Sequence, residues 1–337
     1  MLQFRNETGL AGTILAAADP AGIDSLYAVV KGTFALDRLD PSGIPAPAEE
    51  QVPPVLADEH HGDPAASSIR VPSDLSLVKP ATDVLLLGTA YAAGGRHAEW
   101  MDVTVTAGPL RKIVRVFGDR FWQSGAAGHA ATAPRPFERM PLVWERAYGG
   151  VDQAKDQPRG EARNPVGAGF RAPDGEKPLD GLPLPNLEDP YDPIRSWKQT
   201  VSPAAFAPVA PAWEPRRSRA GTYDEPWQKG RAPYLPADFD PAFFQLAPDG
   251  LVAPGYLQGG EPVEVTGATP EGTLRFRLPV LRIEVDYRVD DRTETRPANL
   301  DTVLIEPDHR RVILVWRTVL ACDKKLLRVR EIAARAA

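Results

Sequence analysis

The chain has 337 residues, of which 43% are hydrophobic and 25% charged, and its formal net charge is −6. This length allows one large domain or two, and the apolar content is sufficient for a core. The net negative charge and the lack of any stripe of Lys and Arg argue against nucleic-acid binding. The single cysteine, Cys322, excludes a disulfide within the chain and fits a reducing compartment.

The first 119 residues are predicted to form β-structure. Leu10–Ala18 is apolar, but the residues before it lack the positive charge of a signal peptide. Runs rich in Val, Tyr, Thr and Phe, separated by turn residues, predict strands over Ser25–Asp37, Asp83–Ala92, Trp100–Ala107 and Leu110–Phe117. No run approaches the ~18 apolar residues of a membrane helix. We therefore expect a soluble, cytoplasmic protein without membrane insertion.

The composition changes between residues 120 and 258. More than half of the 36 prolines lie between Pro134 and Pro241, and most of the seven tryptophans lie between Trp122 and Trp227. Proline removes backbone donors and fixes φ, so this segment can contain little helix or central strand. Disordered proline-rich linkers are poor in large aromatic residues. The segment is therefore predicted to be a long, ordered and irregular insertion held by buried rings, and such loops are usually functional.

Residues 259–337 return to a β pattern. Strands are predicted over Pro262–Gly267, Thr273–Leu278, Leu281–Val289, Thr302–Pro307 and Arg311–Val319. A hairpin turn is predicted at Asp308–His309, and one or two helical turns over Glu331–Ala337.

These patterns predict a mostly β fold with little helix. The N-terminal part (1–119) and the C-terminal part (259–337) would form sandwich-like sheets, and the insertion (120–258) would pack on them. We expect residues 1–337 to form a single composite domain.

The common catalytic and phosphate-binding motifs are absent from the sequence. The sequence DEHHGD at residues 58–63 offers possible metal ligands. Neighbouring side chains on a strand point to opposite faces, however, and such clusters are usually solvated turns. We predict no bound metal and no cofactor.

Aromatic and acidic residues near the end of the insertion resemble a carbohydrate site in composition. The candidates are Trp213, Trp227, Asp224, Glu225 and Asp238. Rings can stack on sugars, and paired acids can perform general acid and base catalysis. Aspartates in such turn-like phrases more often accept backbone N–H bonds. We therefore predict no catalytic residue, and keep glycan chemistry as an alternative.

Several arginines of the insertion lie within a few residues of a tryptophan or tyrosine, namely Arg120, Arg146, Arg216, Arg217 and Arg231. Guanidinium groups that stack on rings and pair with acids would hold irregular loops in place. The same residue types are concentrated at the hot spots of protein interfaces. Both interpretations stay open at this point.

The candidate residues of the insertion fall into two groups. Large aromatic and arginine side chains are the candidates for partner binding: Trp122, Arg146, Tyr148, Phe170, Trp197, Trp213, Arg216, Tyr223, Trp227, Arg231 and Phe239. Small, amide and acidic residues of the characteristic phrases are the candidates for structural roles: Gly118, Asp119, Arg120, Pro141, Gly149, Gly150, Asn164, Pro165, Gly167, Gly169, Asn186, Glu188, Asp224, Asp238 and Asp240.

The N-terminal part contains the phrases FRNETGL, VVKGTFAL and SSIRVPSDLSLVKPATDVLLLGTAYAAGG. The insertion contains GDRFW, MPLVWERAYGG, NPVGAGF, LPNLE, GTYDEPW and LPADFD. In these phrases the chain resembles, over almost its full length, a bacterial family first described only as a domain of unknown function. Members are commonly encoded beside VgrG and PAAR, the spike proteins of the type VI secretion system. The resemblance implies an adaptor or chaperone that loads a toxic effector onto the spike, with no agreed enzymatic activity.

The leading hypothesis is therefore a non-enzymatic adaptor that binds an effector protein or a spike component through the insertion. Two alternatives remain. One is a carbohydrate-active enzyme or glycan-binding β-sandwich protein, and the other is a structural component of the spike or baseplate.

Overall fold

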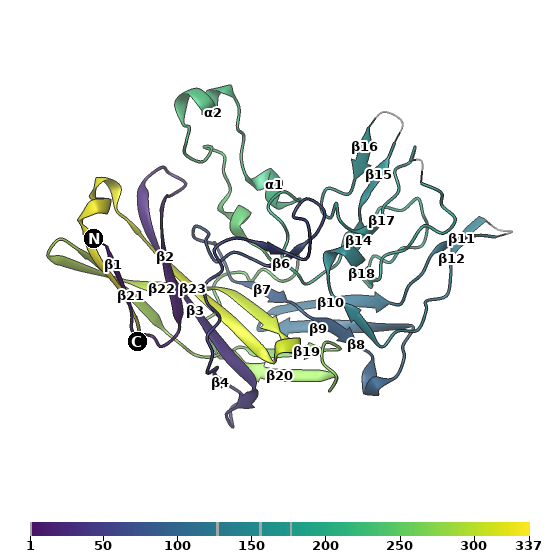
Figure 1. Cartoon of the computed structure of the whole chain (residues 1–337), viewed down its shortest axis with the longest axis horizontal. Coiled ribbons are helices and arrows are strands. Elements are labelled where there is room, and N and C mark those ends of the chain that lie inside the picture. The colour runs from purple at the N-terminus through teal and green to yellow at the C-terminus, as the bar shows by residue number, and fades with distance from the viewer. Residues whose placement is uncertain (1, 126–127, 155–156, 176) are drawn as a thin grey trace.

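The computed structural model of the protein describes residues 2–125, 128–154, 157–175 and 177–337. Its largest element is a nine-stranded sheet with the order β1-β24-β21-β22-β23-β3-β2, in which β4 pairs with β3 and β7 pairs with β22 (Figure 1). The strands of this sheet are β1 (Gln3–Asn6), β2 (Ala11–Ala18), β3 (Asp24–Leu39), β4 (Pro45–Pro47), β7 (Asp83–Leu86), β21 (Ile283–Val289), β22 (Arg292–Glu306), β23 (Arg311–Ala321) and β24 (Val329–Ala336).

The large sheet curls until it is nearly closed like a barrel. Its two end strands, β1 and β2, are consecutive in the chain and are joined by a short turn in which Asn6 Nδ2 donates to the carbonyl oxygen of Leu10 at 2.8 Å. The central strands β3 and β23 pair from Ser25 with Ala321 to Ala35 with Arg311. The paired stretch of the two strands is almost entirely buried, whereas the last three residues of β3 are exposed, which explains why the apolar residues are concentrated in the paired stretch.

The second sheet has five strands in the order β18-β10-β9-β19-β20. They are β18 (Leu187–Glu188), β10 (Leu110–Phe117), β9 (Trp100–Ala107), β19 (Pro262–Thr266) and β20 (Thr273–Arg277). Burial alternates along β9 and β19, as expected for strands with one face on the core. The sheet therefore combines strands of the N-terminal part, the insertion and the C-terminal part.

The insertion contains only short elements of regular structure. They are β11 (Trp122–Gly125), β12 (Gly128–Ala131), β13 (Arg139–Pro141), η2 (Trp144–Arg146), β14 (Tyr148–Gly149), β15 (Val151–Gln153), β16 (Pro158–Gly160), β17 (Ala168–Gly169), α1 (Arg216–Arg219), α2 (Glu225–Gly230) and η3 (Pro241–Phe244). The prediction of an irregular segment with little helix is confirmed.

The remaining short elements lie in the N- and C-terminal parts. They are β5 (Glu59–His60), β6 (Ile69–Val71), β8 (Thr89–Tyr91), η1 (Ala93–Gly95), η4 (Pro307–His309) and η5 (Asp323–Arg328). Among the helices that the structure describes, none is long and apolar enough to cross a lipid bilayer.

One hydrophobic cluster includes buried residues of both sheets and of the insertion. Phe206 and Leu251 of the insertion are fully buried in it beside strands of both terminal parts. Burial of each such side chain contributes roughly 1.5–3 kcal/mol. A second, smaller cluster within the insertion contains Trp122, Leu182 and Leu184.

The predicted helical turns over Glu331–Ala337 are wrong. This segment belongs to strand β24, which pairs antiparallel with β21 and parallel with β1. Its alanines and charged residues favour a helix when isolated, but two neighbouring strands supply ladder hydrogen bonds on both sides. The predicted strand over Asp83–Ala92 is divided into β7 and β8.

Candidate functional site

The AYGG and NPVGAGF phrases of the insertion form one closely packed unit. Asn164 is fully buried, and its Nδ2 donates to the carbonyl oxygens of Trp144 at 2.8 Å and Tyr148 at 3.0 Å. Gly149 has a φ of +153°, and a Cβ atom there would lie 2.1 Å from the Asn164 carbonyl oxygen. Strands β14 and β17 then pair Gly149 with Gly169. These contacts hold the two phrases together.

The GDRFW and LPNLE phrases form a second unit. The buried Arg120 pairs with the buried Glu188, donates to the Pro185 carbonyl oxygen at 2.9 Å and stacks on Phe117 with 3.6 Å to the ring centroid. Asn186 Nδ2 donates to the Phe117 carbonyl oxygen at 3.1 Å. For Arg120, the structure therefore shows stacking and pairing that hold loops in place.

The remaining structural candidates lie around these units. Asn186 also donates to Asp119 and accepts from Arg146 Nη1. A Cβ atom at Gly118 would lie 1.7 Å from the Arg135 carbonyl oxygen. Gly150 is buried, Gly167 and Pro165 are half-buried near Asn164, and the exposed Pro141 ends strand β13.

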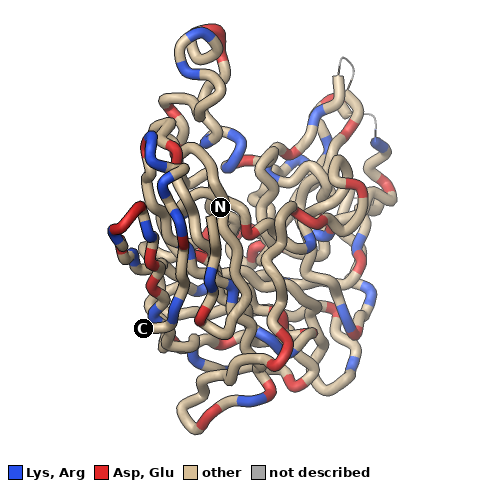
Figure 2. The backbone as a smooth tube through the Cα atoms, turned by 60° about the vertical axis from the view of Figure 1, so that its left-hand side comes forward, with Lys and Arg blue, Asp and Glu red and all other residues tan. Residues whose placement is uncertain are grey.

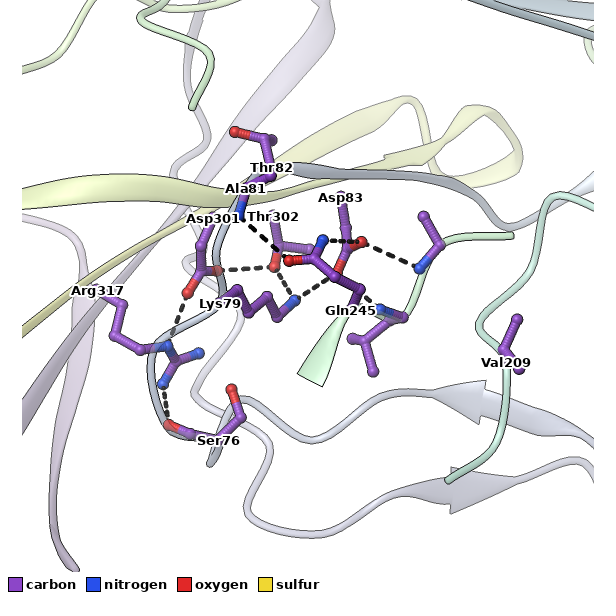
Figure 3. A network of polar contacts seen from close by, with 12 residues as sticks. Ser76, Lys79, Ala81, Thr82, Asp83, Val209, Gln245, Asp301, Thr302 and Arg317 are labelled. Carbon is purple, nitrogen blue, oxygen red and sulfur yellow. Dashed lines mark hydrogen bonds and ion pairs between the residues drawn. The ribbon is translucent and has the colours of Figure 1, made fainter. Parts of the chain in front are cut away.

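A network of buried charges, which sequence reasoning did not find, joins three distant parts of the chain (Figure 3). Asp83 is fully buried, and its carboxylate accepts from Lys79 Nζ at 2.8 Å, Gln245 Nε2 at 2.7 Å, and the backbone N–H groups of Leu246 at 2.8 Å and Ala247 at 3.1 Å. The insertion thereby bonds directly to the strand on which it packs.

The same network continues into the C-terminal strands. Lys79 Nζ also donates to Thr302 Oγ1 at 2.6 Å, and Thr302 Oγ1 donates to Asp301 at 2.8 Å. Arg317 Nε donates to Asp301 at 2.7 Å, and its Nη1 donates to the Ser76 carbonyl oxygen at 3.0 Å. Each charged group therefore has an opposite partner, as buried ions require. The sequence signal was a lysine and an aspartate four residues apart in an otherwise apolar stretch.

The acids of the glycan alternative have structural roles in the folded protein. Asp224 caps α2 by accepting from the Trp227 N–H at 2.9 Å. Asp238 accepts from the N–H of Thr222 at 3.0 Å and from its hydroxyl at 2.7 Å, and these bonds hold its pKa below the usual value. The prediction that these aspartates accept backbone N–H bonds is confirmed. Glu225 pairs with Lys229, and Trp213 is buried against Trp144.

The DEHHGD segment forms part of a small hairpin between β5 and β6. Asp58 accepts from the Ser73 N–H at 2.7 Å, Asp63 accepts from the Ala65 N–H at 2.9 Å, and Glu59 pairs with Arg70. Over the described ranges, no group of three or more His, Cys, Asp or Glu residues is arranged to hold a metal ion.

The predicted partner-binding residues differ in how far their side chains are exposed. Trp122, Tyr148, Trp213 and Arg216 are buried, so they offer little area to a protein interface. Arg146, Phe170, Trp197, Trp227, Arg231 and Phe239 are half-buried, and Tyr223 is exposed. Sequence reasoning did not distinguish these groups, because burial of an aromatic residue in irregular structure leaves no periodic pattern.

Tyr223, Trp227 and Arg231 lie on one projecting segment, residues 221–239, which we call the arm. The arm carries α2 at its tip and extends away from the sheets (Figures 1 and 2). Its two ends are joined by the hydrogen bonds between Thr222 and Asp238.

A contact between two rings and two side-chain hydrogen bonds hold the arm in its conformation. The rings of Tyr223 and Trp227 meet edge to face at 4.7 Å between centroids, and Trp227 Nε1 donates to the Tyr234 carbonyl oxygen at 2.8 Å. Arg231 Nη2 donates to the Pro20 carbonyl oxygen at 2.6 Å, which ties the arm to the turn between β2 and β3. Tyr234, which was absent from the predicted set, is exposed.

The last two candidates, Asp240 and Phe239, lie at the base of the arm. Asp240 caps η3 by accepting from the Ala242 N–H at 2.9 Å. Phe239 packs against Phe243 and Phe244, with centroids 5.6 and 5.5 Å away. The C-terminal end of the arm therefore lies on a packed aromatic cluster.

Comparison with known proteins gives a family and no function. Residues 21–317 match the family described as an uncharacterized protein conserved in bacteria (DUF2169). No curated protein and no solved structure shows significant similarity to the chain. The match extends from the turn before β3 into β23 and so includes the five-stranded sheet, the whole insertion and the central strands of the large sheet, whereas β1, β2 and β24 lie outside it. The chain therefore belongs to the uncharacterized bacterial family DUF2169.

Proposed function

We propose that the protein is a non-enzymatic adaptor of type VI secretion. In this proposal it binds an effector protein in the cytoplasm and helps to load it onto the VgrG and PAAR spike. The assignment to type VI secretion rests on the resemblance of the sequence phrases, since the family description assigns no function. The binding role rests on the arm.

The exposed aromatic residues of the arm are the observation that carries the binding role. Tyr223 is 53% exposed and Tyr234 is 43% exposed. Tyrosine and tryptophan supply large contact areas with little loss of side-chain entropy, and are enriched at interface hot spots. The contact between Tyr223 and Trp227 fixes one of these rings before a partner arrives, which lowers the cost of ordering on binding.

The buried groups beneath the arm support this division of roles. The residues around Asn164, around Arg120 and around Asp83 form three separate groups, and each is buried and hydrogen-bonded internally. They form a rigid base, on which the arm is the projecting feature. A protein-binding element on a rigid scaffold is the usual arrangement for recognition.

The test is co-expression of the full chain with the VgrG, PAAR and effector proteins of the same bacterium, followed by affinity purification. We expect the effector to co-purify with the wild-type protein, and to be lost with the double variant Tyr223→Ala, Tyr234→Ala. Tyr191→Ala is the matched control, because Tyr191 is 83% exposed but lies outside the arm.

Two results would contradict the proposal. An effector that is soluble and fully loaded without this protein would remove the adaptor role. Retention of the protein at fixed stoichiometry in the assembled spike would instead favour the structural alternative.

A further inference from the structure

A pocket of about 300 Å³ lies at the junction of the insertion with the second sheet. Lys112 of β10, Arg216 and Arg219 of α1, and the loop residue Arg163 contribute cations to its lining, which also includes Gln245 and the residues after it. The pocket is independent of the exposed aromatic residues of the arm.

Two charges of this lining are neutralised by local ion pairs. Arg163 forms a two-point ion pair with Glu161, with N–O distances of 2.7 and 2.8 Å. Glu214 pairs with Arg217 at 2.9 Å and accepts from the Ser218 hydroxyl. Neither pair leaves a free charge for a ligand, and Arg219 Nε lies 3.9 Å from a carboxylate oxygen of Asp240. Arg216 and Lys112 therefore decide the chemistry of the pocket.

Arg216 is the most unusual of these cations. It is only 6% exposed, and its guanidinium donates to two backbone carbonyl oxygens, those of Phe243 at 2.7 Å and Val209 at 2.6 Å. Among the described residues, its Nη2 has no hydrogen-bond partner and no carboxylate forms an ion pair with it. A buried cation normally has such a partner, because desolvation costs several kcal/mol.

The charge of Arg216 persists at neutral pH. Burial lowers the pKa of Arg216 to about 10, and the more distant Asp58 and Asp83 oppose this shift. The side chain therefore stays protonated. Its charge is met by two carbonyl oxygens and by the Phe243 ring, whose centroid is 5.1 Å away, but by no carboxylate of the described residues. An anion is the ligand that would complete it.

Lys112 supplies a second cation to the same pocket. Its Nζ donates to the Asp249 carbonyl oxygen at 2.7 Å, and no ion pair to it is formed by a described residue. Burial lowers the pKa of the Lys112 ammonium, while Asp249 and Asp189 oppose the shift. Two further N–H donors of this ammonium are available to a ligand.

We infer that this pocket binds a carboxylate attached to an apolar group, with Arg216 and Lys112 as the groups that hold the anion. The walls contributed by Trp144, Val209 and Val252 suit the apolar part of the ligand. The two oxygens of a carboxylate can accept from Arg216 Nη2 and from the Lys112 ammonium, and hydrogen bonds between charged groups are the stronger kind.

The acidic part of the pocket lining favours a ligand with one negative charge over a ligand with two. The acid Asp249 also lines the pocket, and it would repel the second negative charge of a phosphate. The carboxylate can belong to a free small acid or to a bound protein segment, because the recognised chemistry is the same.

The first experiment measures binding of benzoate to the full chain by isothermal titration calorimetry, with benzamide as the neutral analogue and phenyl phosphate as the dianion. We expect benzoate to bind and benzamide to bind at least about tenfold more weakly. Equal binding of benzoate and benzamide, or no binding of benzoate, would overturn the inference.

The second experiment compares two single-charge variants on the same strand. Lys112→Gln removes a cation of the pocket, whereas Arg111→Gln removes an exposed cation from the opposite face of β10. We expect Lys112→Gln to weaken benzoate binding about tenfold and Arg111→Gln to leave it unchanged. Arg216→Gln should abolish binding, and a thermal melt shows whether that variant is folded. Equal effects of Lys112→Gln and Arg111→Gln would also overturn the inference.

The source of the carboxylate is found by repeating the effector co-purification with Lys112→Gln. Loss of the effector, together with competition by benzoate, would identify a carboxylate of the bound protein. An unchanged effector complex combined with lost benzoate binding would identify a free small acid. Benzoate binding needs no partner protein, so failure of the adaptor proposal and failure of this inference are distinguishable.

Discussion

Two regions of the molecule use the same residue types for opposite purposes. In the network around Asp83, charged groups are buried and each one is bonded to an opposite charge. In the arm, acids and aromatic rings are on the surface, and their hydrogen bonds are local ones between neighbours such as Thr222 and Asp238. The network joins segments more than 160 residues apart, whereas the bonds within the arm span at most 16 residues.

The difference shows where substitutions should matter for stability and where they should matter for binding. Removing one partner from a buried network leaves an unpaired charge in the interior, which is costly. Removing an exposed ring changes a surface that water already contacts. The following predictions test this division, beginning with the largest expected effect.

The Asp83→Asn substitution should destabilise the protein by about 3–5 kcal/mol, because it leaves Lys79 without a carboxylate in the interior. Urea denaturation measures the loss. Glu49→Gln is the matched control, since it removes the carboxylate of the exposed pair with Arg38 and should cost less than about 1 kcal/mol. Similar losses in the two variants would show that the network has no special role.

The Asn164→Ala substitution should cost about 1–3 kcal/mol, because it leaves the buried carbonyl oxygens of Trp144 and Tyr148 without their shared donor. The same denaturation experiment measures it. Gln228→Ala removes an exposed amide from α2 and should change stability by no more than about 0.5 kcal/mol. An unaffected Asn164→Ala protein would exclude a structural role for this phrase.

The ion pair of Glu161 predicts a smaller, pH-dependent effect. Burial raises the pKa of the Glu161 carboxyl, but hydrogen bonds and charge from Arg163 outweigh burial, so the net pKa lies below its ordinary value. Its contribution to stability is therefore present above the unfolded-state pKa of about 4.3 and is lost as the pH falls through the folded-state pKa.

This effect is isolated by comparing wild type with Glu161→Gln from about pH 7 to about pH 3. The wild type should be more stable at neutral pH, and the two proteins should converge in acid. A constant difference across this range would show that Arg163 does not favour the charged carboxylate.

The smallest effect on stability is expected from Tyr223→Ala. This ring is more than half exposed, so the free energy of unfolding should change by no more than about 1 kcal/mol. A thermal melt of the variant, compared with Tyr191→Ala, provides the measurement. A large loss would mean that the arm is part of the folded core and not a separate binding element.

Strand positions were the most predictable feature of the sequence. The predicted strands Trp100–Ala107 and Leu110–Phe117 coincide with β9 and β10, and the predicted turn at Asp308–His309 lies in η4. Here the alternation of apolar residues and the turn residues favour the same structure that the fold adopts. Local preference and tertiary structure agree at these positions.

The parts that failed are those where distant segments decide the outcome. Glu331–Ala337 is rich in alanine and was predicted to be helical, but it became a strand because β21 and β1 pair with it. Arg216 was predicted as a ring-stacking or partner-binding residue, and its guanidinium does lie 5.1 Å from the centroid of the Phe243 ring. Its place in a pocket wall with Lys112 was not predicted. A sequence does not show which carbonyl groups and carboxylates will surround an arginine.

The pairing of β3 with β23 has a consequence for the newly made chain. β3 ends at Leu39, and β23 begins at Arg311. At roughly 5–20 residues per second, the ribosome needs on the order of tens of seconds to make the partner strand after β3 has emerged. During that time an apolar strand with an open edge is exposed, and such edges recruit other chains. Solubility during synthesis should therefore depend on shielding of residues 24–39 until translation is nearly complete.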